Sequence, residues 1–305
     1  MKKAISNFIN KNSNKKWFHF IDELLYRIIK VDVISAGAQL AYFLMLSLFP
    51  LLIFILGMVN SSSILQSDYL IEAIEHLPDM TKGILENFIN AISNNTTHGV
   101  ISIAAIGSIW SSSTGVFKLM KVVESTYDEE NNRSFFLQRF MSIVFTFALL
   151  FLMTLLTVLN VLGSKIGKTI FEFLGAYAPN FDLWNSIEPF FLLAYMVLVM
   201  VAFYRYSLSY RLRKDIKFKH LIFGAAFTSV MVLIFTRVFS LYVDNFSNYS
   251  VVYGSLAGII ILLVWLFAMG IIFILGGIIN AAYYYSSQTD YDWPKEYSFF
   301  KKLID

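Results

Sequence analysis

Cysteine is absent from the 305-residue chain, and charged residues are scarce. Without cysteine the protein has no disulfide, no thiolate metal site and no cysteine nucleophile. Only 15% of the residues are Asp, Glu, Lys or Arg, whereas 57% are hydrophobic. A typical soluble domain has about 25% charged residues, which it needs to cover its surface. The composition therefore indicates an integral membrane protein.

Recognisable catalytic sequences are missing as well. No HExxH, GxSxG, Walker or GxGxxG sequence occurs, so metal-assisted hydrolysis, serine-hydrolase chemistry and nucleotide hydrolysis have no motif to support them. The four histidines lie in separate segments, at His19, His76, His98 and His220. We therefore expect no catalytic residue, no metal site, no cofactor and no nucleic-acid partner, and a membrane-tethered nuclease stays only as a third alternative.

Long apolar runs account for most of the chain. Because a helix needs about 20 residues to cross the hydrocarbon core, we predict six spans, at 33–59, 99–121, 140–162, 188–204, 218–243 and 256–284. The fold class is then all-α: a polytopic membrane protein of six transmembrane helices, with an N-terminal amphipathic helix and short extracytoplasmic helices within 60–98. The predicted domains are a cytoplasmic amphipathic segment (1–32), a six-span membrane domain (33–285) and a cytoplasmic tail (286–305).

Lysine and arginine alternate between the two sides of this topology. The segment 1–32 and the loops after spans two and four are basic, whereas the loops after spans one, three and five carry few lysines and arginines. Positive charge favours cytoplasmic loops, so both termini are expected in the cytoplasm. The polar, basic start of the chain lacks the apolar region of a signal peptide, so the first span is expected to be retained.

The segment before the first span has an apolar stripe at helical spacing. It contains Trp17, Phe18, Ile21, Leu24, Leu25, Ile28 and Ile29. Two interpretations stay open at this point. The helix could lie on the membrane surface with this stripe in the interface, or it could pack on the protein's own cytoplasmic loops.

The second predicted span changes character halfway along. Its first part, 100–109, is apolar, and it continues as WSSSTG over 110–115, with Lys118 and Lys121 beyond. A backbone loosened by such a run must find hydrogen-bond partners inside the protein, because lipid offers none. We therefore expect this span to be surrounded by other spans, with its hydroxyls toward a polar interior or cavity.

The topology places polar and basic residues of several spans at one depth, in or just below the inner leaflet. We predict that they line a polar vestibule open to the cytoplasmic leaflet. The residues are Gln39, Ser111, Ser112, Thr114, Lys118, Arg139, Arg205 and Asn280. Lysine and arginine neutralise phosphate, and hydroxyls and amides replace water around it. Such a vestibule suits an anionic lipid or amphiphile.

Two classes of function follow. The first is a transporter or flippase-like protein that moves or binds an anionic lipid from the cytoplasmic leaflet, with membrane lipids as its partners. The second is a non-transporting membrane scaffold for envelope assembly, which holds envelope enzymes through its amphipathic N-terminus and basic loops. For the lysines and arginines of the vestibule, the alternative to a binding site is contact with bulk anionic lipid.

With these residues in view, the chain resembles the YihY/BrkB family of bacterial inner-membrane proteins. The stretches that carry the resemblance are 35–43 (SAGAQLAYF), 46–50 (LSLFP), 110–115 (WSSSTG), Tyr127 to Arg139, Tyr253-Gly254, Leu275-Gly276 and Asn280-Ala281. The resemblance implies a six-span helical protein of the bacterial inner membrane. It also brings an old ribonuclease label that is regarded as mistaken, and a link of some members to serum resistance and envelope lipid transport. The family often has a Glu where this chain has Ile278, so a proton or cation carried by that carboxylate is not expected here.

Overall fold

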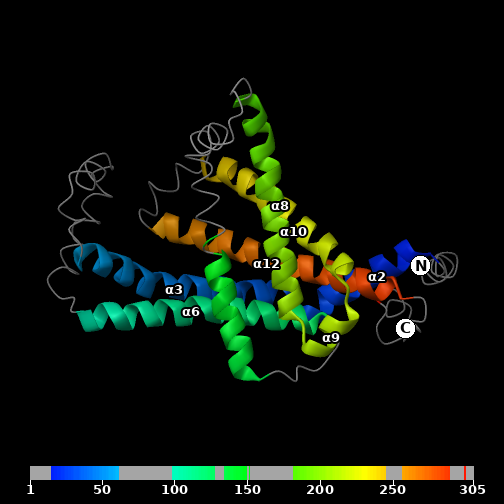
Figure 1. Cartoon of the computed structure of the whole chain (residues 1–305), viewed down its shortest axis with the longest axis horizontal. Coiled ribbons are helices and arrows are strands. Elements are labelled where there is room, and N and C mark those ends of the chain that lie inside the picture. Colours follow the sequence, from blue (N-terminus) through cyan, green and yellow to red (C-terminus); the bar gives the residue numbers. More distant parts are fainter. Residues whose placement is uncertain are drawn as a thin grey trace, which may run out of the picture. The chain divides into compact units, whose positions relative to one another are not determined.

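The computed structural model of the chain describes residues 15–61, 98–127, 134–149, 151, 181–244, 256–288 and 299. Every secondary-structure element in these ranges is an α-helix (Figure 1), which confirms the predicted all-α class. The residues belong to two compact units, one made of Met1–Ala41 with Val116–Asp305 and the other of Tyr42–Gly115.

The helices follow the predicted spans closely. They are α2 (Lys16–Val31), α3 (Val33–Ser61), α6 (His98–Ser125), α8 (Phe181–Ser207), α9 (Tyr210–Asp215), α10 (Phe218–Asp244) and α12 (Leu256–Ser286). A shorter apolar helix, Phe135–Leu149, lies at the start of the predicted third span. The rest of that span, and the short extracytoplasmic helices predicted within 60–98, lie outside the described residues.

Three helices in the described part of the chain are long and apolar enough to cross a membrane: α8 over Phe190–Ser207, α10 over Phe218–Val243 and α12 over Ala257–Ser286. A fourth crossing results if α2 and α3, which are bent by 52° at their junction, form one broken span. Large apolar side chains on the outside of these helices are exposed, among them Leu198, Phe223 and Val264. Hydrocarbon accommodates such a surface, whereas water penalises it.

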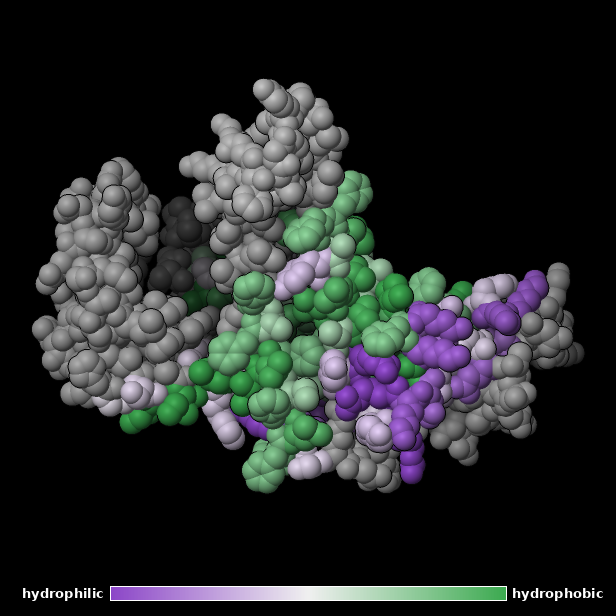
Figure 2. Space-filling view, in the orientation of Figure 1, coloured by the Kyte–Doolittle hydropathy of each residue, from purple (hydrophilic) through white to green (hydrophobic). Residues whose placement is uncertain are grey.

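Hydrophilic surface gathers over the part of the larger unit that holds α9 and α2, whereas apolar surface predominates over the other coloured helices in this view (Figure 2). This separation is typical of a protein whose apolar belt lies in a membrane and whose polar end faces water. The structure therefore shows a helical membrane protein. The count of six spans stays a prediction.

α12 is the helix on which the larger unit is built. It runs beside α10 (Figure 1), and the two backbones are in close contact at Gly224 and Gly276. A methyl group on Gly224 would overlap the carbonyl oxygen of Gly276. Only glycine allows the two backbones to come this close. In lipid such close van der Waals packing stabilises helix association, because the hydrophobic effect does not drive helices together there.

Hydrogen bonds attach α8 to this contact between α10 and α12, which we call the seam. The Tyr204 hydroxyl of α8 donates to the Phe273 carbonyl at 2.8 Å and lies 2.6 Å from the Thr228 hydroxyl of α10. Tyr204 is almost completely buried. One side chain therefore ties three helices together.

The small-residue stretch at the start of α3 also packs against α12. A β-carbon on Gly37 would lie 2.9 Å from Cγ1 of Ile271, and one on Gly270 would lie 3.2 Å from the Gly37 α-carbon. The sequence indicated close packing at this stretch, and the structure confirms it.

Candidate functional site

The described residues bring polar and basic side chains together where α6 and α8 end and the Phe135–Leu149 helix begins. We call this group the basic-aromatic cluster. Its members are Phe117, Lys121, Glu124, Gln138, Arg139 and Ser207. A shallow depression is lined by Phe117, Met120, Lys121, Glu124, Gln138 and Ser207. In the predicted topology this is the cytoplasmic end of all three helices.

The local sequence of α6 explains why its side chains face one way. Phe117, Met120, Lys121 and Glu124 are spaced three or four residues apart, so they share one face of the helix. Gln138 and Arg139 lie in the second turn of the Phe135–Leu149 helix, and Ser207 is the last residue of α8. The cluster thus depends on three helix ends meeting.

The Phe117 ring is the centre of the cluster's positive charge. The Lys121 Nζ lies 4.7 Å from the ring centroid, and the Arg139 guanidinium carbon lies 6.0 Å from it. Cations at this distance are attracted by the negative face of the ring. The attraction of each cation to the same ring offsets part of the repulsion between the two positive groups.

The polar side chains around the depression are buried. The Gln138, Glu124 and Ser207 side chains are at least 95% buried. The Ser207 hydroxyl donates to the Phe203 carbonyl at 2.8 Å. The Gln138 Nε2 has no hydrogen-bond partner among the residues that the structure describes. An unpaired buried donor is costly, so this amide is suited to a ligand oxygen.

Two cations and an amide donor form a set that suits an anionic oxygen such as that of a phosphate. The Glu124 carboxylate lies in the same depression, and it opposes a bare anion. Of the predicted vestibule residues, Arg139 belongs to this cluster. Lys118 is exposed and is turned by about 100° from Phe117 on α6. Gln39 is also exposed, on α3.

Arg205 makes contacts within the fold. Its Nη1 donates to the Ile216 carbonyl at 3.0 Å and its Nη2 to the Arg213 carbonyl at 3.2 Å. Its guanidinium also lies 4.2 Å from the Phe218 ring centroid. These carbonyls lie at the C-terminal end of α9, where a cation complements the helix dipole. Arg205 thus connects α8, α9 and the start of α10.

Asn280 is fully buried where α10 crosses α12. Its Oδ1 accepts a hydrogen bond from the Gly224 backbone amide at 2.7 Å. Within the described part of the chain, its Nδ2 has no hydrogen-bond partner. The side chain thus links the two helices through its Oδ1, while its Nδ2 is not used in that link.

The serine and threonine run belongs to the second compact unit, and it does not interrupt α6. The Ser112, Ser113 and Thr114 hydroxyls donate to carbonyls three or four residues earlier, Ser108 or Trp110, at 2.7, 3.0 and 2.8 Å. The expectation of a loosened backbone was therefore wrong, because these side chains bond to their own helix. A hydroxyl in this position has acceptor capacity left, but it must rotate to donate to an anion.

Several members of the basic-aromatic cluster were missed by sequence reasoning. Lys121, Glu124 and Gln138 were not assigned to the vestibule. The spacing of Phe117, Lys121 and Glu124 was a usable signal, since it places an aromatic, a cation and a carboxylate on one helix face. No pattern in the sequence showed that Gln138 would meet that face.

The fold and this site define a class: a polytopic helical membrane protein with a basic, aromatic cluster at one end of its helices. A sequence model of the family described as Virulence factor BrkB matches residues 24–298. The chain belongs to this family, which confirms the resemblance drawn from the sequence.

Relatives agree with this assignment. The chain is 34% identical over 262 residues to the putative ribonuclease-like protein YfkH of Bacillus subtilis (strain 168), covering 86% of this chain and 94% of the relative. It is 25% identical over 269 residues to a UPF0761 membrane protein of Vibrio parahaemolyticus, covering 86% and 81%. No solved structure matches the chain. Among the described residues, no group of three or more His, Asp or Glu could hold a metal ion.

Proposed function

We propose that this protein binds and moves an anionic lipid or amphiphile from the cytoplasmic leaflet of the bacterial inner membrane. The observation that carries the proposal is the basic-aromatic cluster, in which Lys121 and Arg139 flank Phe117 beside the unpaired Gln138 amide. Arginine and lysine supply the charge for a phosphate, and the amide supplies a directed donor. The cluster would capture the headgroup and would catalyse no covalent step.

The topology belongs to the same proposal. We propose six spans with both termini in the cytoplasm, which places the cluster at the inner leaflet. Beyond the cluster, the path would be lined by the residues predicted from the sequence: Gln39, Ser111, Ser112, Thr114, Lys118, Arg205 and Asn280. For Arg205 and Asn280 a role on the path would come in addition to the contacts that they make within the fold.

A vesicle assay tests the proposal. Purified protein is reconstituted with fluorescent phosphatidylglycerol, and dithionite then reports how fast the label exchanges between leaflets. The variant carrying both Lys121→Gln and Arg139→Gln should exchange lipid about tenfold more slowly or worse, since a hydrogen bond to a charged group contributes about 1.5–3 kcal/mol. A Lys214→Gln variant is the matched control, because Lys214 is an exposed lysine on α9, outside the cluster.

Each outcome decides between the functions. Exchange by the natural protein at the rate of empty vesicles would reject transport and favour the non-transporting scaffold. Exchange that survives in the double variant would reject the cluster as the headgroup site. Fluorescent phosphatidylethanolamine, run in parallel, shows whether Glu124 admits an amine beside the phosphate.

A further inference from the structure

The polarity of α2 is inverted relative to that of a surface helix in water. Its charged residues Asp22, Glu23 and Arg27 are 1%, 1% and 0% exposed. Its apolar residues Trp17, Ile21 and Ile29 are 50%, 37% and 64% exposed. A helix on the water-facing surface of a protein would bury the second set and expose the first.

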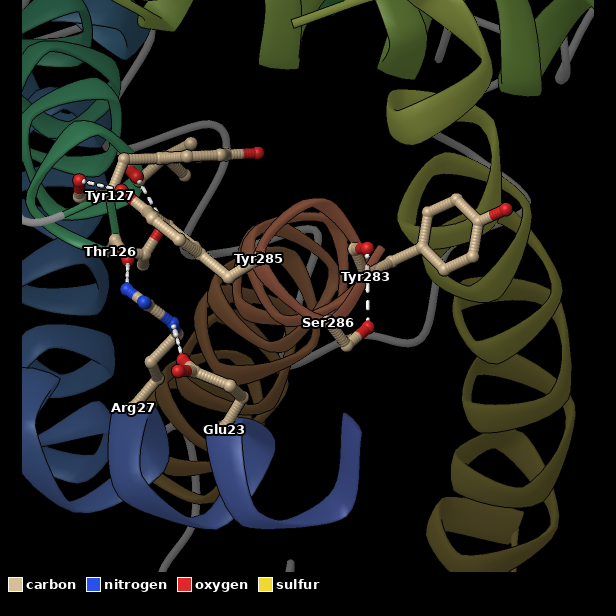
Figure 3. A network of polar contacts seen from close by, with 8 residues as sticks. Glu23, Arg27, Thr126, Tyr127, Tyr283, Tyr285 and Ser286 are labelled. Carbon is tan, nitrogen blue, oxygen red and sulfur yellow. Dashed lines mark hydrogen bonds and ion pairs between the residues drawn. The ribbon is translucent and has the colours of Figure 1, made fainter. Parts of the chain in front are cut away.

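Two of the inward charges, Glu23 and Arg27, pair with each other inside the protein. The Arg27 Nε donates to Oε2 of Glu23 at 2.8 Å, four residues earlier. Its Nη1 donates to the Thr126 carbonyl, just beyond the end of α6 (Figure 3). A guanidinium suits this position because the last carbonyls of a helix lack partners within the helix.

Aromatic rings complete the same contact. The Arg27 guanidinium lies 4.3 Å from the Tyr285 ring centroid, and the Tyr285 hydroxyl donates to the Tyr127 carbonyl (Figure 3). Burial raises the pKa of the Tyr127 phenol, so this ring stays neutral. The charged face of α2 is thus fixed on the ends of α6 and α12.

The opposite face of α2 is apolar along its whole length. Trp17, Ile21, Leu24 and Ile28 are spaced four, three and four residues apart, so they form one stripe. Trp17 and Ile21 are exposed, and Leu24 and Ile28 are partly exposed. Because the charged face packs on α6 and α12, the stripe faces away from them. An apolar environment there would stabilise it.

Charge at the start of the helix identifies that environment. Lys15 and Lys16 precede the stripe, with the Lys15 Nζ 5.8 Å from the Trp17 ring centroid. At the other end of the helix the Lys30 Nζ lies 5.8 Å from the ring centroid of the buried Tyr26, on the side away from the stripe. α3 follows α2 after the single residue Asp32, which adopts a left-handed conformation with φ of 48°. The stripe is therefore continuous with the membrane entry of the chain, and its basic N-terminal flank is complementary to anionic headgroups.

We infer that α2 lies in the cytoplasmic leaflet, with the Trp17–Ile28 stripe against acyl chains and with Lys15 and Lys16 against anionic headgroups. The helix is then part of the lipid-facing surface of the membrane domain, and its partner is the anionic lipid surface. This inference does not depend on lipid transport. A scaffold with no transport activity would hold α2 in the same way.

The absence of cysteine from the chain provides a direct test. Ile21→Cys is labelled with a fluorophore sensitive to polarity and reconstituted into vesicles of phosphatidylethanolamine and phosphatidylglycerol. The emission should shift to the blue, and brominated lipid should quench it by about twofold or more, as for an interfacial helix. Lys214→Cys on α9 is the control, with water-like emission and little quenching.

Two results would overturn the inference. One is water-like emission from Ile21→Cys in protein that elutes as a single folded species. The other is a blue shift that brominated lipid does not quench and that fades when the protein is diluted into more lipid, since this would place a second copy of the chain on the stripe. Ile28→Cys lies about two turns further along the same stripe. It should show the same blue shift and quenching as Ile21→Cys.

Discussion

At the scale of single residues, Arg205 and Arg139 differ in their surroundings. Arg205 uses two of its nitrogens on the carbonyls of Ile216 and Arg213. Arg139 lies beside Gln138, whose amide has no partner among the described residues. The sequence alone could not separate these two arginines, since both were predicted at the same depth.

Replacement of Arg205 should lower stability more than charge alone explains. Arg205→Lys keeps the positive charge but loses the planar fork that reaches two carbonyls. We expect Arg205→Lys and Arg205→Gln both to lower the free energy of unfolding by about 1–2 kcal/mol, measured as a lower melting temperature in detergent. Equal melting temperatures of the natural protein and Arg205→Gln would show that these hydrogen bonds contribute little to stability.

The part of the site that sequence reasoning found, and the part that it missed, have a common physical explanation. Arg139 was predicted because charge near a span boundary is visible in the sequence, and the structure places it beside Phe117. Gln138 and Lys121 were missed because their role depends on which helix faces meet. Periodicity gives the face of one helix, and it does not give the neighbour of that face.

At the scale of helices, hydropathy predicted most boundaries. The predicted span at 218–243 became α10 (Phe218–Asp244), and the one at 256–284 became α12 (Leu256–Ser286). α6 departed from the expectation, because side-chain hydroxyls can bond to their own helix and leave it intact. In α2 the charged face packs on the ends of α6 and α12, while the apolar stripe is exposed. Its placement on a membrane surface stays a prediction.

The seam between α10 and α12 gives the clearest prediction at this scale. Gly224→Ala should lower the free energy of unfolding by about 3 kcal/mol or more, because its methyl group would overlap the Gly276 carbonyl and force the helices apart. Gly258→Ala in α12 is the matched control, since nothing lies within 4 Å of a β-carbon there. Melting in detergent compares the two, and similar melting temperatures would contradict the close approach.

At the scale of the whole molecule, the proposed topology can be tested by labelling two single-cysteine variants. The six-span arrangement places Lys214 in the cytoplasm and Gly99 outside. In intact cells, a membrane-impermeant maleimide should label Gly99→Cys but not Lys214→Cys, and permeabilised cells should label both. Labelling of Lys214→Cys but not Gly99→Cys in intact cells would show the opposite orientation. Labelling of both variants in intact cells would contradict the three spans predicted between these two positions.

The seam also limits how this protein can move. Tyr204, Thr228 and the Phe273 carbonyl interlock three helices, and the Asn280 side chain reaches the α10 backbone at Gly224. A slide of α10 along α12 by one residue would drive a side chain into a space shaped for glycine. Sliding of α10 along α12 is therefore opposed by the packing itself, and a rotation that keeps these contacts would cost less.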